Sequence, residues 1–439
     1  MLIEFSVGNF ASFKETITLS LVAAKIRSIN KRLDSDNIIP IDQELGLLRS
    51  AAVYGANASG KSNLVAAASF MSRFVRESFE KPFDAGIPVD RFRLSTDTDD
   101  QPSHFEMVFL LDGHQYRYGF DVDAQQVAAE WLYYVPKKRE ILLFERTGQE
   151  IIPNTSNPQA GEFRAIPKQL VKVNPNQPLR PNALFLSVAA QNQGPMAQQI
   201  LTWFGNMRFM SGLNDSGFRH FTVNMFEKPE SRARIIELVR SLDVDIDDIG
   251  IQRREGEKVL EEAPEYMRAV LEKLHIADFV QITTQHRKMN PSGDVVGYEI
   301  FDMGIHESAG TEKLFFMTGP IIDTLTYGRV LWVDEMEARL HPNMTEAIVA
   351  LFNSPITNPK GAQIIFTTHD TNLLNIKKLR RDQIWFVEKN RQAASQLYSL
   401  VEFKIRNDDA SLEQDYIRGR YGAVPHIDEL SAAYEVETR

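Results

Sequence analysis

The segment from Gly55 to Ser62 constrains the fold of this chain more than any other part of its sequence. It joins a strand-like stretch, Leu48 to Tyr54, to a segment, Asn63 to Phe79, that carries apolar residues at helical spacing. Glycines in such a turn allow successive backbone N–H groups to surround a phosphate, and the following helix N-terminus adds a favourable dipole. A chance glycine turn rarely has a strand before it and a helix after it. The chain is therefore expected to contain a P-loop within an α/β domain.

The residues of this loop have separate expected roles. Lys61 would neutralise the β- and γ-phosphates of a nucleotide, and the hydroxyl of Ser62 would be a ligand of Mg²⁺. The residues expected to surround the nucleotide are Gly55, Ala56, Asn57, Ala58, Ser59, Gly60, Lys61, Ser62 and Asn63. The sequence therefore predicts ATP and Mg²⁺ as cofactors.

An acidic pair follows a second apolar strand. Val330 to Val333 leads directly into Asp334 and Glu335. A protein core tolerates two adjacent carboxylates only if they are paired, bound to metal or at the exposed tip of the strand. The tip suits catalysis, with Asp334 in the Mg²⁺ shell and Glu335 as the general base for the attacking water. Taken alone, the pattern would also fit a strand that runs into a solvated loop.

A third apolar strand, Ile364 to Thr368, ends at His369. In isolation this histidine would be read as a surface residue or a helix cap. Since the carboxyl ends of parallel strands lie at one edge of a sheet, we expect His369 near the γ-phosphate.

The segment from Glu307 to Lys313 begins the helix that precedes the acidic strand, and it places Ser308 and Gly310 at the helix start. A simple N-cap by Ser308 explains the hydroxyl on its own. The order of P-loop, small-residue helix start, acidic strand and strand-end histidine favours a second phosphate-binding helix end instead.

The remaining sequence predicts a chain of three parts. Residues 1–150 would hold the P-loop and an antiparallel β subdomain, because the region from 104 to 135 alternates polar and apolar residues. Residues 151–295 would form a largely helical insertion without the sustained heptads of a coiled coil. Within it, the Pro- and Asn-rich residues 153–181 would be a loop, and residues 189–203 and 231–242 would be helices. Residues 296–439 would return to alternating strands and helices, which predicts a mostly parallel sheet covered on both faces.

Composition excludes several classes of protein. The chain has 439 residues, of which 43% are hydrophobic and 25% charged, as in an ordinary globular protein. It contains no Cys and shows no secretory signal or membrane-spanning run, so a cytosolic location is expected. A net charge of -10 disfavours binding to DNA except at a local basic surface.

Together the motifs resemble those of ABC-type ATPases of the Rad50 and SMC clan. The likeness is closer to the compact branch without coiled coils found in bacterial anti-phage loci, namely the RloA and AbiL type and the ATPase subunits of PARIS defence systems. It rests on Leu2 to Phe13, Gly55 to Ser62, Glu307 to Lys313, Glu335 to Pro342 and Gly419 to Pro425.

This resemblance implies an ABC-ATPase head that forms a homodimer around ATP. Ser308 and Gly310 would be the signature motif, which reaches the γ-phosphate held by the partner's P-loop, and His369 would be the switch histidine. Residues 337–341 would form the D-loop. Glu307 stands where a leucine usually precedes the signature serine. No Q-loop glutamine could be assigned, with Gln101 and Gln115 as candidates.

The leading hypothesis is an ATPase that hydrolyses ATP slowly and serves as the scaffold of an anti-phage complex. The resemblance implies a TOPRIM-type nuclease effector as partner, and a phage-encoded trigger protein is a further candidate partner. A DNA-repair ATPase that binds DNA directly is the alternative, and a transport or metabolic ATPase subunit is a third. A homo-oligomer larger than the dimer is also expected, with its size left open.

Overall fold

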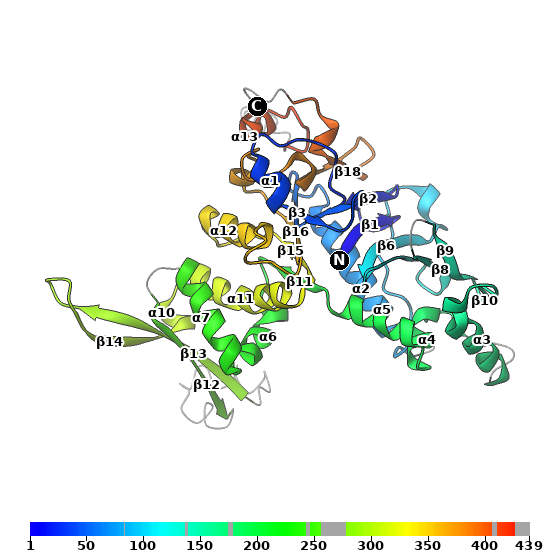
Figure 1. Cartoon of the computed structure of the whole chain (residues 1–439), viewed down its shortest axis with the longest axis horizontal. Helices are drawn as coiled ribbons and strands as arrows, with labels where there is room; N and C mark the ends of the chain where they lie inside the picture. The colour runs from blue at the N-terminus through cyan, green and yellow to red at the C-terminus, as the bar shows by residue number, and fades with distance from the viewer. Residues whose placement is uncertain are drawn as a thin grey trace, which may run out of the picture. The chain divides into compact units, whose positions relative to one another are not determined.

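The structure is a computed structural model in which the chain forms two compact units (Figure 1). The described residues are 1–82, 84–136, 139–173, 179–242, 246–255, 278–405 and 411–425. The first unit comprises residues 1–209, 327–336 and 349–439, and the second comprises residues 210–326 and 337–348. Each unit is described by itself.

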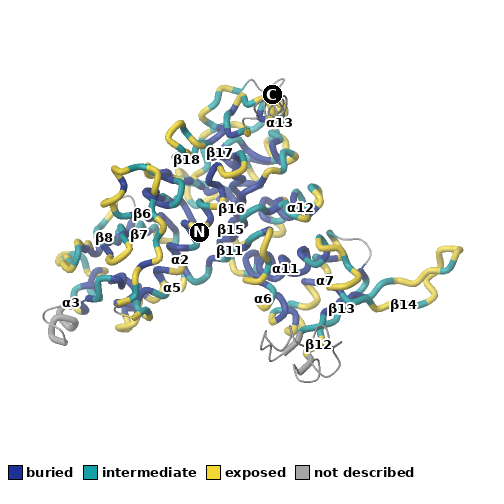
Figure 2. Tube along the Cα trace, turned by 180° about the vertical axis from the view of Figure 1, so that it is seen from behind, coloured by how far each residue is buried: buried dark blue, intermediate teal, exposed yellow. Residues whose placement is uncertain are grey.

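A mainly parallel sheet forms the centre of the first unit. Its strands, in spatial order, are β11 (Arg208–Ser211), β15 (Val330–Asp334), β16 (Gln363–Thr367), β5 (Ser50–Tyr54), β17 (Ile384–Lys389) and β18 (Ser395–Ser399), of which β18 pairs antiparallel to β17. Every residue of β5 and β16 is buried, as expected for a parallel sheet covered on both faces (Figure 2). The predicted α/β fold with a mostly parallel sheet is thus confirmed.

An antiparallel sheet makes up the other half of the first unit. It contains β10 (Glu150–Pro153), β9 (Ile141–Thr147), β8 (Val127–Val135), β7 (His114–Val122), β6 (Ser103–Leu111), β1 (Leu2–Gly8) and β2 (Ile17–Ser20), in that order. Neighbouring strands alternate buried and more accessible residues, which is the pattern that predicted an antiparallel subdomain. The antiparallel β subdomain is therefore present as expected.

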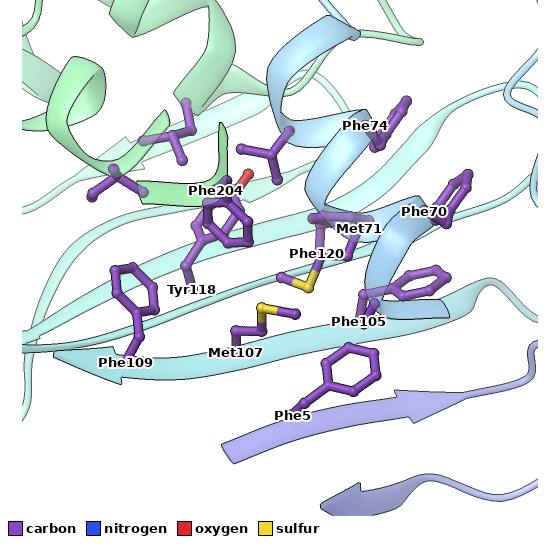
Figure 3. Close-up of a cluster of buried hydrophobic side chains, with 14 of the residues drawn as sticks. Phe5, Phe70, Met71, Phe74, Phe105, Met107, Phe109, Tyr118, Phe120 and Phe204 are labelled. Atoms are coloured by element: carbon purple, nitrogen blue, oxygen red, sulfur yellow. The ribbon is translucent and has the colours of Figure 1, made fainter. Parts of the chain in front are cut away.

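Helix α2 (Lys61–Glu77) follows the P-loop, and its apolar side chains pack into the core of this unit. Figure 3 shows its aromatic side chains lying against those of the antiparallel sheet. The ring centroids of Phe70 and Phe105 are 4.9 Å apart, and those of Phe74 and Phe120 are 5.4 Å apart. Burial of each such ring stabilises the fold by about 1.5–3 kcal/mol, so α2 is held firmly against the antiparallel sheet.

The region from residue 153 to 209 contains more helix than its sequence suggests. The Pro- and Asn-rich part was expected to be a loop, but α3 (Gly161–Val173) occupies much of it. The predicted helix from 189 to 203 is two helices, α4 (Phe185–Gln191) and α5 (Pro195–Gly205). The break is local, because Gln193 has a φ of 63° and a proline opens α5.

The second unit combines helices with a small antiparallel sheet. Helices α6 (Ser216–Phe226), α7 (Pro229–Leu242) and α11 (Ala309–Tyr327) belong to it, apart from the last residue of α11. A Cβ on Gly319 would lie 2.4 Å from the hydroxyl of Thr222, so glycine allows α6 and α11 to approach closely. β11 (Arg208–Ser211) carries the chain from the first unit to the second.

The sheet of the second unit was not predicted. Strands β12 (Asp248–Glu255), β13 (Asp278–Met289) and β14 (Val295–Asp302) pair in this order, and α10 (Met303–His306) follows. The expectation that residues 151–295 are largely helical is therefore wrong for this part of the region. The division into two parts of one ATPase domain, 1–150 and 296–439, separated by an insertion at 151–295, remains a prediction.

Shorter elements complete the described chain. They are α1 (Lys31–Asp36), β3 (Ile38–Pro40), β4 (Gly46–Leu48), α12 (Pro342–Asn353) and α13 (Leu412–Ile417). Within the described ranges no helix has the length and apolar character to span a bilayer. The same ranges contain no long coiled-coil arm, since α11 is only 19 residues long and the other described helices are shorter.

Candidate nucleotide-binding site

The P-loop connects β5 to α2 with a backbone that only small residues can adopt. Gly60 has a φ of 113° and Ala58 a φ of 59°, both in the left-handed region. A Cβ on Gly55 would lie 2.4 Å from the carbonyl oxygen of Val387, and one on Gly60 would lie 2.3 Å from the hydroxyl of Ser395. The two glycines therefore stand where the chain has no room for a side chain.

Lys61 is the first residue of α2 and is buried against the loop. Its Nζ donates hydrogen bonds to the carbonyl oxygens of Gly55 at 2.8 Å and Ala56 at 3.0 Å. These bonds hold the ammonium group along the loop, where a phosphate chain would lie. Ser62, the next residue, is exposed.

A group of hydroxyl side chains supports the loop, and sequence reasoning missed it. The hydroxyl of Ser395 donates to the carbonyl oxygen of Ser59 at 2.5 Å, and its oxygen lies at hydrogen-bond distance, 2.7 Å, from the hydroxyl of Ser12. The amide of Asn63 donates to the same hydroxyl of Ser12 at 2.7 Å. These contacts tie the P-loop to distant parts of the chain, so no local pattern could have revealed them.

The acidic pair lies at the carboxyl end of β15 and is organised by one threonine. Thr367 donates a hydrogen bond to Asp334 Oδ1 at 2.6 Å and accepts one from the backbone N–H of Glu335 at 2.8 Å. Glu335 has a φ of 50°, a conformation that costs a residue with a side chain of this size roughly 1–2 kcal/mol. Strain of this kind at a strand end is typical of a functional position.

One cavity brings most of the predicted residues together. It measures about 550 Å³ and is lined by Asn57, Ala58, Ser59, Gly60, Lys61, Ser62, Asn63, Glu335, His369 and Lys389. His369 is exposed and comes two residues after the end of β16, between the strands that carry the P-loop and the acidic pair. The predicted convergence of loop, acid and histidine is present in the first unit.

Lys389 is the cavity residue that the sequence analysis did not single out. It is the last residue of β17, the parallel neighbour of β5 on the side away from β16. The same rule that pointed to the other strand ends applies to it, because β17 reads as an apolar run that ends in a charged pair. Its exposed ammonium group adds positive charge to the cavity.

The residues present fit a magnesium nucleotide. Within the described ranges no three His, Asp or Glu side chains form a group that could hold a metal ion by itself. Mg²⁺ is usually bound by one or two protein oxygens together with water and substrate phosphates, and Ser62 and Asp334 could supply such oxygens. The buried hydroxyl of Ser59, within the loop, has no hydrogen-bond partner in the described part of the chain. An unsatisfied donor at this point suits an anionic ligand.

The signature residues lie in the second unit, together with the expected D-loop. The hydroxyl of Ser308 accepts a hydrogen bond from the backbone N–H of Thr311 at 3.0 Å, so the serine does cap α11. A Cβ on Gly310 would lie 2.6 Å from the carbonyl oxygen of Arg339, and Lys313 donates to the carbonyl oxygen of Ala338. The helix start and the D-loop are therefore packed directly against each other.

The two Q-loop candidates do not join the site. Gln101 lies in the turn before β6, and Gln115 is in β7. Neither lines the cavity that contains the P-loop. The Q-loop residue stays unassigned.

Comparison with known proteins gives one family and a distant structural similarity. Residues 50–375 match the family described as "AAA domain, putative AbiEii toxin, Type IV TA system". The SMC head domain from Thermotoga maritima aligns with 92% of this chain and 99% of its own, at 12% identity and a TM-score of 0.38, too low to support an argument. A search of curated proteins finds no significant match. The family match spans the P-loop, the signature residues, the acidic pair and His369.

Proposed function

The chain belongs to the AAA-domain family whose description names a putative AbiEii toxin of type IV toxin–antitoxin systems, and from this premise we propose that it binds ATP with Mg²⁺ and hydrolyses it slowly. Membership agrees with the resemblance to ATPases of the ABC type. The observation that carries the proposal is the single cavity lined by the P-loop, Glu335 and His369.

In this proposal the residues of the first unit have separate roles in binding and hydrolysing the nucleotide. Lys61 and the loop N–H groups bind the β- and γ-phosphates, while Lys389 adds positive charge at the rim. Bound Mg²⁺ would neutralise charge on the phosphates, with Ser62 and Asp334 as its protein ligands. Glu335 accepts a proton from the attacking water. The hydrogen bond from its backbone N–H to Thr367 holds the backbone of Glu335 in place and so helps to orient the carboxylate. His369 contacts the γ-phosphate.

We further propose that two copies of the chain complete the site. Ser308 and Gly310 belong to a compact unit different from the one that holds the P-loop. In a head-to-tail homodimer, these residues of one subunit would contact the γ-phosphate bound by the other. The contacts between the start of α11 and the D-loop support a shared role of the two segments at such an interface.

The proposed biological role is control of a toxic nuclease. The homodimer would hold a separate nuclease effector of the TOPRIM type and release it in response to a phage-encoded trigger, as in the PARIS systems. The family's description as part of a toxin–antitoxin system supports a role in controlling a toxic protein. A cytosolic location remains a prediction. Direct binding to DNA is the alternative, and the net charge of -10 counts against it.

Nucleotide binding and the dimer are tested with purified protein. Calorimetry with a non-hydrolysable ATP analogue should show binding that Lys61→Ala abolishes and that Lys404→Ala, at an exposed position outside the cavity, leaves unchanged. Light scattering should show persistent dimers of the wild-type protein with the analogue and Mg²⁺, and monomers without nucleotide. Binding that survives in Lys61→Ala would contradict the site.

The effector is tested in cells that carry the genomic neighbourhood of this chain. A neighbouring gene product should copurify with the wild-type protein, and Lys61→Ala should remove phage resistance. If no neighbour copurifies and resistance survives the substitution, the scaffold role is wrong. ATP-dependent DNA binding that weakens with salt would favour the alternative.

A further inference from the structure

The residue immediately before the signature serine is held by the small sheet of the second unit. The side chain of Glu307 is only 11% exposed, and its Oε1 lies 2.7 Å from Nε2 of His286, whose side chain is 18% exposed. The hydroxyl of Thr284 donates to the same oxygen. Two side chains of β13 therefore converge on the backbone segment that leads into α11.

The geometry of β13 explains why these two side chains act together. Thr284 and His286 are two positions apart, so they project from the same face of the strand. Oγ1 of Thr284 and Nε2 of His286 lie 3.2 Å apart, so these two atoms and the carboxylate oxygen are mutually in contact. An ionised carboxylate can only accept hydrogen bonds, so Nε2 of His286 carries the hydrogen in this arrangement.

Packing from β14 fixes the imidazole ring. The ring centroid of Phe301 lies 4.9 Å from that of His286 and 5.3 Å from that of His306. Asp302, at the end of β14, accepts a hydrogen bond from Gln281 of β13 at 2.9 Å. The end of the sheet and the residues just before Ser308 thus form one connected group.

We propose that Glu307, held by His286 and Thr284, is a positioning residue. It aligns the hydroxyl of Ser308 with the γ-phosphate of the ATP that the partner subunit binds. This inference rests on the proposed ATP-bound homodimer. A nearly buried carboxylate is stable only while its partners remain in place, so movement of β13 relative to α11 breaks the contact and misaligns Ser308. The three-stranded sheet is then a control element of the signature motif.

The first test separates nucleotide binding from turnover. Glu307→Gln should lower kcat roughly ten- to hundredfold, the size expected for a lost hydrogen bond to a charged group, while KM for ATP changes less than about twofold. KM is spared because the P-loop of the first unit is untouched. Glu299→Gln is the matched control, since its partner Lys288 lies 3.3 Å away on the same hairpin and both side chains are more than half exposed. It should leave kcat unchanged.

The second test asks whether His286 acts through Glu307. His286→Phe should lower kcat like Glu307→Gln, and the double variant should be no slower than either one, because both remove the same contact. His286→Gln, which keeps a hydrogen-bond donor, should recover part of the rate. Thermal unfolding and binding of the ATP analogue, measured for each variant, show whether it is folded.

The outcomes distinguish this inference from the proposed function. If Glu307→Gln and His286→Phe keep the wild-type kcat while Lys61→Ala abolishes ATP binding, the positioning role is wrong and the ATPase stands. Additive losses in the double variant would also overturn it. If Glu307→Gln does not fold, the comparison of His286→Phe with His286→Gln decides alone: equal rates contradict the inference, and a higher rate for the glutamine variant supports it.

Discussion

Thr367 donates a hydrogen bond of 2.6 Å to the carboxylate of Asp334 from the neighbouring parallel strand. The same hydroxyl accepts the backbone N–H of Glu335, so one side chain orients both members of the acidic pair. Thr367→Val keeps the shape and removes the hydroxyl. Loss of a hydrogen bond to a charged group costs about 1.5–3 kcal/mol, so we expect kcat to fall roughly ten- to hundredfold.

Phosphate-release kinetics at saturating ATP measure this effect. Thr324→Val is the control, because Thr324 is also a buried threonine, and its hydroxyl donates to the carbonyl oxygen of Pro320 in α11. Both variants should lose some stability, but only Thr367→Val should lose activity. Equal kcat values for the two variants would show that Thr367 does not organise the acidic pair.

Glu335→Gln should trap the ATP-bound dimer. The water loses its base while the phosphate-binding loop is unchanged, so turnover should fall about 100-fold or more. Light scattering should find dimers that persist with ATP itself, whereas the wild-type dimer dissociates as ATP is consumed. Hydrolysis at the wild-type rate would exclude Glu335 as the base.

Glu335→Gly provides a separate test of the strained backbone at this position. A glycine adopts the φ of 50° without the steric cost of a side chain, although it adds entropy to the unfolded chain. The two effects are each about 1 kcal/mol, so the unfolding temperature should be equal to or above that of the wild type while activity is lost. A clear drop in unfolding temperature would mean that the side chain of Glu335 stabilises the fold.

The parts of the site that could be predicted from the sequence are those with local patterns. The P-loop, the acidic pair and His369 each follow an apolar strand, and parallel strands bring their carboxyl ends to one edge. Thr367 and Ser395 could not be assigned in this way. Their roles depend on which strands are neighbours and on contacts between residues far apart in the chain.

The sheet of the second unit was missed for a different physical reason. Strand β13 contains the run Thr283 to Lys288, which is polar throughout, so it has no apolar face for period-two alternation to reveal. On β14 apolar side chains such as Val296, Tyr298 and Ile300 are exposed, which a core-based argument would not place at a surface. Glu307 could not be interpreted without its partner on this sheet.

Gly55→Ala should abolish nucleotide binding and destabilise the first unit. The new methyl group would lie 2.4 Å from the carbonyl oxygen of Val387, a backbone atom that cannot rotate away. Overpacking of this kind costs about 1–3 kcal/mol. Gly217→Ala in α6 is the control, because a Cβ there has no atom within 4 Å, and alanine should stabilise the helix by up to about 1 kcal/mol. Urea unfolding and ATP-analogue calorimetry measure both effects.

Glu130 offers a test of stability away from the cavity. Its carboxylate is fully buried and accepts the backbone N–H groups of Phe185 and Leu186 at 2.6 and 2.9 Å, with Arg146 as the nearby cation at 3.5 Å. Glu130→Ala should destabilise the protein by about 3–5 kcal/mol, because Arg146 is left as a buried charge without its partner. The exposed Glu150→Ala should cost less than about 0.5 kcal/mol.

The pH dependence of this stability has a definite sign. Burial raises the pKa of Glu130 above its ordinary value, although Arg146 opposes the shift. The folded state therefore binds the proton more tightly than the unfolded state, and this contribution to stability is present at low pH and is lost as pH rises through the raised pKa. Glu130→Gln lacks the titrating group, so the stability gap between wild type and this variant should narrow as pH rises above 4.5, the ordinary pKa of a glutamate. Urea unfolding across this range, with a gap that widens instead, would show that the attraction of Arg146 outweighs burial.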